Sequence, residues 1–443
     1  NIYNMSINNT QIQDIKKSID TFKESILSLN DYYMLNDIIQ ELFDEYIKSN
    51  ILSISNPYFI DEVIHNIKEL LSIQFDFIDP DILSYTFDIL IDKVMNIYFT
   101  HVMPRRSYKN TFIRKTPNVP IMQNKIQAIK NKPQPEQRTK EWYEFRHNLI
   151  TASSAWKALD SQSSINSIIY EKCKPYDDSK YDNVNMNTPF HWGTKYEPIS
   201  VQLYEYIYKT TVEDFGCIQH DTFKFIGASP DGINTNPESP LYGRMLEIKN
   251  IVNREINGIP KPEYWIQMQL QMEVCNLNEC DFLETRFLEY DNYTEFMQDG
   301  TFTKTANDKQ KGIFVLFFEN GKPHYEYPPI DIDNSQFETW EQNIIEKNKH
   351  MEWIKNIYWK LDTLSCVLVL RNKLWFKQAV ISISGVWDII ERERISGYDH
   401  RAPKKRNKSF DEKEKKNNCL LSFKDNEVSL YTTIHIETNP LKL

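Results

Sequence analysis

Apolar residues recur at helical spacing in the first part of the chain. The runs "IQDIKKSIDTFKESILSL" and "DEVIHNIKELLSI" place Ile, Leu and Phe three or four positions apart, with Asp, Asn and Pro between the runs. Such spacing is typical of amphipathic helices that bury one face. We therefore expect roughly four helices between residues 10 and 103, and we assign residues 1–103 to a separate N-terminal helical domain.

Helical and strand-like patterns alternate in the middle of the chain. The first patterns predict a helix with a capped successor at 140–158, an amphipathic helix at 195–209, and strands at 222–228 and 244–250. Later runs predict a helix in "EYWIQMQLQMEVC", a strand in "CDFLETRFLEY" and a hairpin in "GIFVLFFENGKPHYEY" that turns at Asn320-Gly321. Strands and helices that alternate within one core favour an α/β sandwich, here over residues 138–330.

The segment before this core is basic and irregular. Between residues 105 and 140, ten Lys and Arg residues stand against a single acid, Glu136. The prolines and the lack of periodicity predict a linker at 104–137. Contact with DNA phosphates is one hypothesis for these cations, and plain solvation is the commoner role of a basic linker.

The last part of the chain is predicted to be mostly helical. The run "FETWEQNIIEKNKHMEWIKNIYWKL" predicts one long helix, and "GVWDIIERER" predicts another. The charged segment "HRAPKKRNKSFDEKEKK" follows, and we expect it to be flexible. Residues 331–443 are thus expected to form a C-terminal extension.

Composition narrows the class of protein. A chain of 443 residues is long enough for two or three domains, and 40% apolar with 13% aromatic residues is typical of a globular protein. The net charge of -10 argues against a protein that coats nucleic acid over its whole surface, because phosphate binding depends on Lys and Arg. A local basic groove stays open.

Cysteine spacing and hydropathy exclude further classes. The six cysteines are scattered and form no CxxC pair, so we expect no zinc site, no iron–sulfur cluster and no disulfide framework. The N-terminus shows no apolar signal core, and the most apolar stretch is interrupted by Arg371, Lys373 and Lys377. We expect a soluble protein in a reducing compartment, without contact to a membrane.

The stretch "GASPDGINTNPESPLYGRMLEIKN" at residues 227–250 carries the most suggestive charges. In a strand, Glu247 and Lys249 lie two positions apart and project from the same face, while Leu246 and Ile248 face the core. The turn-forming residues of "NTNPESP" allow the chain to return and to bring Asp231 beside Glu247.

Two carboxylates held close together repel each other unless a cation lies between them. Mg²⁺ prefers oxygen ligands, so Asp231, Glu247 and the Ile248 carbonyl would suit it. Lys249 could then orient or deprotonate a water, or stabilise charge on phosphorus, which fits metal-assisted phosphodiester hydrolysis. The alternative is a solvated strand face with an Asp that only forms a turn.

Two helices supply further polar candidates. Glu197 lies in the helix of "HWGTKYEPISVQLYEY" and could point at the metal. The alternative is an ordinary first-turn glutamate, which the helix dipole stabilises. In "EYWIQMQLQMEVC", Gln267 and Gln271 share one stripe beside an apolar one. Gln267 could hydrogen-bond a water or a phosphate, and a satisfied, partly exposed amide is the alternative for either glutamine.

An anion site is predicted further upstream. In "EWYEFRHNLITASSAW", Arg146 precedes Ser153 by seven residues, and the Thr-Ala-Ser run is typical of a helix start. Free backbone N–H groups, a hydroxyl and a guanidinium together suit a terminal phosphate. The alternative role for Ser153 is a plain helix cap.

With these motifs in order, the sequence resembles the λ-exonuclease and YqaJ-type viral recombinase branch of the PD-(D/E)xK nucleases. The match runs from "EWYEFRHNLITAS" through "WGTKYE", "SPDG" and "LEIK" to "YWIQMQLQ", over residues 138–290. The resemblance implies a restriction-endonuclease-like α/β core with a mixed central sheet flanked by helices, here extended by helical parts at both ends. It also implies a Mg²⁺-dependent exonuclease, with Mn²⁺ as a substitute, that degrades one strand of duplex DNA from a 5′ end.

The resemblance assigns a role to each matching residue. Asp231 and Glu247, with the Ile248 carbonyl, look like the metal ligands, and Lys249 looks like the catalytic lysine. Glu197 looks like the helix acid, and Gln267 looks like the first glutamine of a QxQ helix. Arg146 and Ser153 look like the pair that holds a 5′-phosphate. Asp221, ten residues before Asp231, and Gln269, the second glutamine, are further candidates.

The chain also departs from this family. Its simplest members are ring-shaped trimers with little beyond the nuclease core, whereas this chain adds about 100 residues or more at each end. The additions put the ring in doubt and could serve DNA contacts, a homo-oligomer, or a single-strand annealing or recombination partner. We expect DNA ends as substrate and an intracellular location, in the cytoplasm or in a viral replication compartment.

Three alternatives stay open at this point. The same core could act as a structure-specific or non-specific endonuclease, although a terminal-phosphate pocket makes sense only for an enzyme that starts at an end. A DNA-binding or assembly protein could have kept the fold without the reaction, although Asp231, Glu247 and Lys249 are all present. The N-terminal helices could also be a protein-interaction module.

Overall fold

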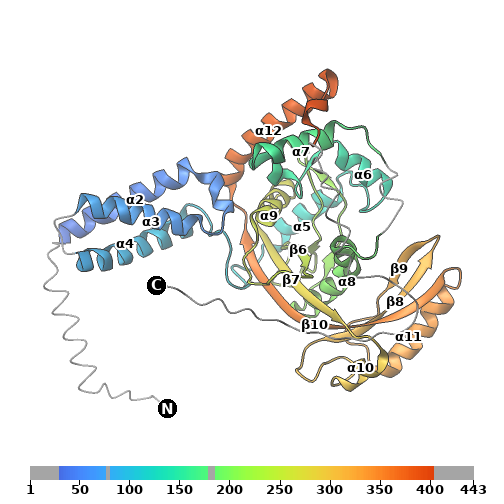
Figure 1. Ribbon diagram of the computed structural model, residues 1–443. Helices are drawn as coiled ribbons and strands as arrows, with labels where there is room; N and C mark the ends of the chain where they lie inside the picture. The colour runs from blue at the N-terminus through green and yellow to red at the C-terminus, as the bar shows by residue number, and fades with distance from the viewer. Residues whose placement is uncertain (1–28, 76–79, 178–184, 404–443) are drawn as a thin grey trace, which may run out of the picture. The chain divides into compact units, whose positions relative to one another are not determined.

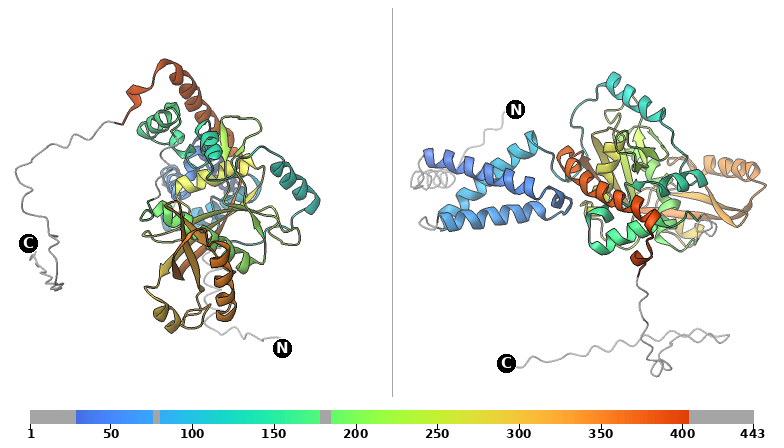
Figure 2. Two further views of the ribbon diagram at one scale, coloured as in Figure 1. Left: turned by 90° about the vertical axis from the view of Figure 1, so that its right-hand side faces the viewer. Right: turned by 90° about the horizontal axis from the view of Figure 1, so that it is seen from above.

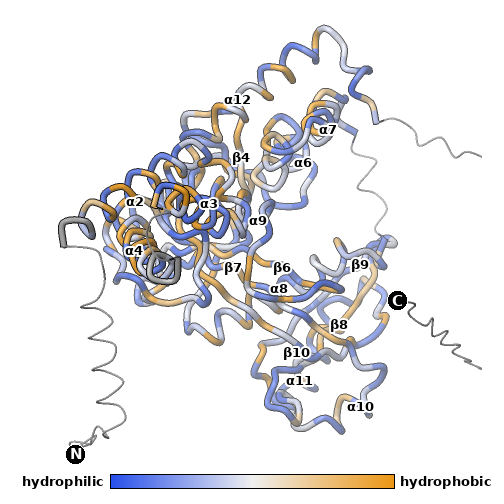
Figure 3. Tube along the Cα trace, turned by 60° about the vertical axis from the view of Figure 1, so that its left-hand side comes forward, coloured by the Kyte–Doolittle hydropathy of each residue, from blue (hydrophilic) through white to orange (hydrophobic). Residues whose placement is uncertain are grey.

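The computed structural model describes residues 29–75, 80–177 and 185–403 (Figure 1). Three helices lie within residues 29–101, α2 (Leu29–Ser49), α3 (Phe59–Gln74) and α4 (Pro80–His101), with a short 3₁₀ helix η1 (Ile51–Ser55) between α2 and α3. Hydrophobic positions recur along these helices (Figure 3), and the stripe of α2 is fully buried at Leu35, Ile39, Phe43 and Ile47. The helical prediction is confirmed from residue 29 onward, whereas the helix predicted within residues 10–28 lies outside the described residues.

The basic segment 104–137 is docked on the rest of the protein. It contains helix α5 (Val119–Lys130), which begins where the Asn118 side chain accepts a hydrogen bond from the Ile121 amide. The backbone of Tyr108 and Thr111 donates to carbonyls of strand β10 (Glu352–Leu370). Several cations pair within the protein: Arg106 is buried against two carbonyls, Lys130 pairs with Glu213, and Lys132 pairs with Asp221. The expected lack of periodicity is wrong for 119–130, which form α5, whereas 104–118 and 131–137 contain no helix or strand and are held by these contacts.

A mixed sheet of seven strands forms the centre of the fold. Its order is β2-β5-β6-β7-β10-β8-β9, and β6 and β7 run parallel while every other neighbouring pair is antiparallel. The bounds of the strands are β2 (Val212–Glu213), β5 (Gly232–Asn234), β6 (Met245–Asn250), β7 (Glu279–Glu289), β8 (Lys311–Glu319), β9 (Lys322–Glu326) and β10 (Glu352–Leu370). A small sheet of β1 (Ile150–Thr151), β4 (Ile226–Ala228) and β3 (Ile218–Gln219) accompanies it, with the strands in the spatial order β1-β4-β3. The predicted α/β core with a mixed central sheet is confirmed.

Helices cover the two faces of β6 according to the alternation of its side chains. Leu246 and Ile248 pack with Tyr204 of α8 (Pro189–Tyr208). Met245, on the other face, shares a core with the apolar residues of α9 (Pro262–Val274). The charged residues of β6 therefore face the α9 side of the sheet, since they alternate with Leu246 and Ile248.

Helices α6 (Lys140–His147) and α7 (Gln162–Cys173), with a 3₁₀ helix η2 (Ala155–Leu159), surround the small sheet. Helix α12 (Lys373–Ser396) packs along α7 (Figure 2), and the sequence predicted part of this helix in "GVWDIIERER". The charged segment after residue 403 lies outside the described residues.

The predicted long helix after residue 331 is wrong. Helix α11 (Asn334–Lys347) begins with a capping box between Asp333 and Gln336 but ends at Asn348, and β10 follows. Ile357 and Trp359, two residues apart, are both buried, which is the period of a strand. Pairing with β7 on one side and β8 on the other fixes this segment as a strand, so the sheet extends beyond residue 330.

The hairpin of β8 and β9 agrees with its prediction. Its two connecting residues, Asn320 and Gly321, have φ values of 51° and 76°. Positive φ at both positions is the requirement of a type I′ turn, which Asn-Gly satisfies with least strain. A local signal was sufficient here.

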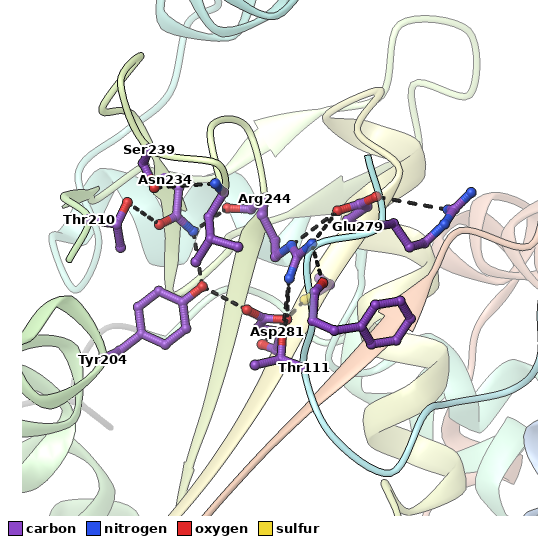
Figure 4. Close-up of polar contacts among 12 residues, drawn as sticks. Thr111, Tyr204, Thr210, Asn234, Ser239, Arg244, Glu279 and Asp281 are labelled. Atoms are coloured by element: carbon purple, nitrogen blue, oxygen red, sulfur yellow. Dashed lines mark hydrogen bonds and ion pairs between the residues drawn. The ribbon is translucent and has the colours of Figure 1, made fainter. Parts of the chain in front are cut away.

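A buried polar network joins the docked segment to the sheet (Figure 4). Arg244, only 3% exposed, contacts the carboxylates of Asp281 and Glu279 and donates to the Thr111 hydroxyl at 2.9 Å. The Tyr204 hydroxyl of α8 donates to Asp281 at 2.7 Å. Charges buried in this way are tolerated because each finds a partner. The network ties β6 to β7, to α8 and to the docked segment.

Two further findings concern the described residues. Five cysteines are free thiols, and all five are buried: Cys173, Cys217, Cys275, Cys280 and Cys366. Within the same residues, every helix falls short of the length and apolarity that crossing a membrane requires.

Candidate active site

Asp231 lies in the turn that leads from β4 into β5. Its carboxylate accepts a hydrogen bond from the Ile248 amide at 2.7 Å. Strand β5 pairs with β6 only through Gly232 with Leu246 and Ile233 with Met245. Asp231 therefore lies just beyond the last residues that pair with β6 on this side, where β6 continues paired with β7 only. The geometry places it beside Glu247, as the loop residues predicted.

Glu247 is fully buried, and two side chains from different elements hold its carboxylate. Lys249 donates to one carboxylate oxygen, and Gln271 of α9 donates to the other at 2.7 Å. Gln271 was not among the candidate site residues of the sequence, although it shares a helical stripe with Gln267. The spacing of four residues from Gln267 indicates that Gln271 lies on the same side of α9, but it does not indicate that Gln271 contacts Glu247.

The charges of this cluster influence one another strongly. Burial raises the pKa of Asp231 well above its usual value, and the nearby Glu247 carboxylate raises it further. Burial alone would lower the pKa of Lys249, but the Glu247 and Asp231 carboxylates outweigh it and raise the pKa. Two carboxylates and one cation thus share one small volume.

Glu197 faces the same cluster from α8. Its carboxylate accepts a hydrogen bond from Arg138 at 2.7 Å, and burial raises its pKa. Helix α8 begins at Pro189, earlier than the expected residue 195, because the Thr188 side chain caps it through the His191 amide. The first turns of α8 are fixed on β6, since the Asn250 side chain donates to the Gly193 carbonyl at 2.9 Å.

The two glutamines of the QxQ motif have different environments. Gln267 lines the cavity described below. Gln269 is fully buried elsewhere: it donates to the Leu370 carbonyl at 3.0 Å and accepts from the Asn372 amide at 2.6 Å. Residues two apart on a helix point about 200° apart, so both glutamines cannot face one site. Gln269 instead joins α9 to the end of β10 and the start of α12.

Asp221 is not brought to the cluster. Its side chain is 74% exposed and pairs with Lys132 at 2.8 Å. It is absent from the described lining of the cavity. Its place in the fold is an ion pair with the docked segment 104–137.

Arg146 and Ser153 meet as the sequence predicted. The Arg146 guanidinium donates to the Ser153 hydroxyl at 3.1 Å and lies 4.2 Å above the Trp142 ring. Ser153 lies in the turn before η2, and the residue at the cap position of η2 is Ser154, so Ser153 is not the cap. Lys172 of α7, only 5% exposed, donates to the Arg146 carbonyl at 2.9 Å and reinforces the end of α6.

One cavity of about 1010 Å³ connects the two clusters. Its lining includes the predicted residues of both, namely Arg146, Ser153, Glu197, Asp231, Ile248, Lys249 and Gln267. Glu247 is not among the lining residues: it is fully buried and contacts Lys249, which lines the cavity. A ligand in this cavity could therefore contact the Arg146–Ser153 pair and the Asp231–Lys249 cluster at the same time.

The residues present fit a hard divalent cation. Within the described ranges no three His, Cys, Asp or Glu side chains are gathered as a ready metal cage. The Asp231 and Glu247 carboxylates instead interact with the Ile248 amide, Lys249 and Gln271. The two carboxylates nevertheless offer only oxygen ligands, and burial together with their mutual repulsion raises the pKa of Asp231. Both properties favour a cation such as Mg²⁺ between them.

The region that contains both clusters also matches a family model. Residues 141–278 match the family model described as the YqaJ-like viral recombinase domain. The resemblance inferred from the motifs is confirmed. The matched YqaJ-like domain begins in α6 and ends just before β7, so it includes both clusters of the cavity.

Relatives and solved structures extend the comparison. An uncharacterized protein of Acanthamoeba polyphaga mimivirus is 30% identical over 332 residues, which are 66% of this chain and 58% of that protein. The crystal structure of an alkaline exonuclease from Laribacter hongkongensis is 18% identical, with a TM-score of 0.34, and the match covers 58% of this chain and 94% of the other. A phage-related exonuclease from Haemophilus somnus 129PT is 13% identical, with a TM-score of 0.31 and coverages of 56% and 96%. Both structures are distant likenesses.

Proposed function

We propose that this protein is a metal-dependent DNA exonuclease that hydrolyses one strand of duplex DNA from a 5′ end. The observation that carries the proposal is the single cavity that joins the Asp231–Lys249 cluster to the Arg146–Ser153 pair. The first cluster suits phosphodiester hydrolysis, and the second suits a terminal phosphate. The YqaJ-like domain over residues 141–278 supports the same reaction class.

Asp231, Glu247 and the Ile248 carbonyl would hold Mg²⁺, for which Mn²⁺ could substitute. A divalent ion there supplies Lewis-acid stabilisation of phosphate charge and lowers the pKa of a bound water. Lys249, kept protonated by the two carboxylates, can face the negative charge of a phosphate entering the cavity. Glu197 and Gln267 provide an acceptor and an amide on the cavity wall that can position a water or a phosphate oxygen.

The Arg146–Ser153 pair would select the DNA end. A guanidinium and a hydroxyl that already lie 3.1 Å apart can donate together to one phosphate group. Stacking on Trp142 restricts the Arg146 side chain and so reduces the entropy that binding would cost. An internal phosphodiester lacks the extra terminal oxygens that such a pocket would bind.

The family description, a viral recombinase domain, supports a role in viral-type recombination, repair or replication. A 5′-directed enzyme leaves a 3′ single strand, which a single-strand annealing or recombination partner could then bind. The match with the mimivirus protein spans 58% of that protein's length. We propose that this chain acts inside the cell, in the cytoplasm or in a viral replication compartment.

The test is digestion of linear duplex DNA with Mg²⁺, carrying either a 5′-phosphate or a 5′-hydroxyl, beside closed circular DNA. We expect the wild type to degrade 5′-phosphorylated ends. Lys249→Ala should lose activity by about 100-fold or more, because it removes the cation of the cluster, and Arg146→Ala should lose the preference for the 5′-phosphate.

Other outcomes would select the alternatives. Equal cutting of closed circular DNA would contradict the end-directed reading and favour an endonuclease. Absence of cutting with Mg²⁺ or Mn²⁺ would contradict the enzyme itself and favour a DNA-binding or assembly protein. Retention of the 5′-phosphate preference by Arg146→Ala would remove the terminal-phosphate role from this pair.

A further inference from the structure

Arg138 has an unusual backbone at the rim of the cavity. Its φ is 68°, in the left-handed region that residues with a side chain seldom adopt. It is also among the residues that line the cavity. Strained backbone of this kind persists only where the surroundings determine it, and it is frequent at functional sites.

The residues on both sides of Arg138 are anchored. The Gln137 side chain donates to the Phe215 carbonyl at 2.9 Å and to the Pro230 carbonyl at 3.2 Å. Pro230 is the residue before Asp231. On the other side, Thr139 caps helix α6 through the Trp142 amide. Arg138 therefore connects a residue bound beside the cluster to the helix that carries Arg146.

The Arg138 side chain is directed at one acid of the cavity. Its guanidinium donates to the Glu197 carboxylate at 2.7 Å, with 44% of the Arg138 side chain and 27% of the Glu197 side chain exposed. The planar guanidinium fixes the direction of a carboxylate more strictly than water would. Without this partner, Glu197 would sample several rotamers toward the solvent.

We propose that Arg138 is a positioning residue for Glu197, held in a left-handed conformation so that it orients this carboxylate in the cavity. The inference rests on the proposed nuclease function and deepens it. Arg138 precedes the first of the matched motifs, "EWYEFRHNLITAS", and the family model begins at residue 141. Arg138 acts through Glu197 and is not itself expected to contact the scissile bond.

Glycine is the informative substitution. Arg138→Gly removes the guanidinium but tolerates the positive φ, so the protein should melt within a few degrees of the wild type. Lys209→Gly is the matched control, because Lys209 also has a positive φ of 50° and ends α8 outside the lining of the cavity. Comparison of the two separates the loss of the cation at the cavity from the relief of backbone strain.

The experiment measures kcat and KM for digestion of linear 5′-phosphorylated duplex with Mg²⁺. We expect Arg138→Gly to lower kcat by roughly 10- to 100-fold with KM nearly unchanged, and Lys209→Gly to change neither. Guanidinium chloride, well below denaturing concentrations and matched in ionic strength by NaCl, should restore part of the kcat of Arg138→Gly. In a double-mutant cycle, Arg138→Gly should lower kcat only slightly further when Glu197→Gln is already present.

Each contrary result has a distinct meaning. An unchanged kcat in Arg138→Gly, or a loss that adds fully to that of Glu197→Gln, overturns the positioning role while the nuclease proposal stands. A rise in KM alone would make Arg138 a DNA contact and would also overturn it. A wild type that cuts no DNA overturns the function and the inference together.

Discussion

At the scale of single residues, the decisive contacts are those that fix the two carboxylates. Asp231 is held by the Ile248 amide, and Glu247 by Lys249 and Gln271. The closeness of Asp231, Glu247 and Lys249 could be predicted, because turn-forming residues let the chain return and two of the three charges lie on one strand face. Gln271 and Arg138 could not, since helical spacing does not name the residue opposite, and a positive φ leaves no signal in an arginine.

The role of Gln271 can be tested against its neighbour on α9. Gln271→Met removes the donor to a buried Glu247 oxygen, so it should destabilise the protein by about 1–3 kcal/mol and also lower kcat by about tenfold. Gln269→Met removes bonds to Leu370 and Asn372, away from the cavity, so it should lower stability but keep kcat. Denaturant unfolding and single-turnover digestion of both variants would check this, and equal loss of kcat in both would contradict it.

At the scale of elements, local signals were reliable and distant pairing was not. Asn320-Gly321 predicted its hairpin because the turn chemistry lies within the two residues themselves. The start of strand β10 was mistaken for helix, since its partners lie between 34 residues (Glu352 with Phe318) and 91 residues (Leu370 with Glu279) away in the sequence and no local pattern names them. The docking of segment 104–137 on the rest of the protein was missed for the same reason. Arg106, for example, donates to the carbonyls of Ser55 and Pro260, which are distant in the sequence.

The Arg244 network gives a prediction at this scale. Arg244→Met leaves Asp281 buried without its cation and should cost about 3–5 kcal/mol in the free energy of unfolding. Asp281→Asn in the same chain should recover part of the loss, because the unpaired charge is then gone. Urea unfolding of the single and double variants measures this. A double variant as unstable as the sum of the single ones would show that the two residues are not coupled.

At the scale of the whole molecule, an acidic protein presents a locally basic cavity. The net charge is -10, yet the cavity is lined by six Lys and Arg residues, Arg138, Arg146, Lys172, Lys174, Lys249 and Arg254. Four acids stand against them, Glu171, Asp177, Glu197 and Asp231. Attraction to DNA should therefore be confined to this region.

The salt dependence of DNA binding tests that confinement. If only the cavity cations replace counterions, log Kobs against log salt should have a slope no steeper than about -5, because each neutralised phosphate contributes about -0.9. Fluorescence anisotropy with EDTA present would measure binding without cleavage. A steeper slope would show that cations elsewhere, such as those of residues 104–137 or of the charged segment after residue 403, also contact DNA.

The position of β10 has a consequence for synthesis of the protein on the ribosome. Strands β7 and β8 both precede β10 in the chain, yet β10 lies between them in the sheet. Until residues 352–370 have left the exit tunnel, the edges of β7 and β8 that pair with β10 carry unpaired N–H and C=O groups. The nascent chain should therefore depend on chaperones through this interval, and the sheet that carries Glu247 should close only late in translation.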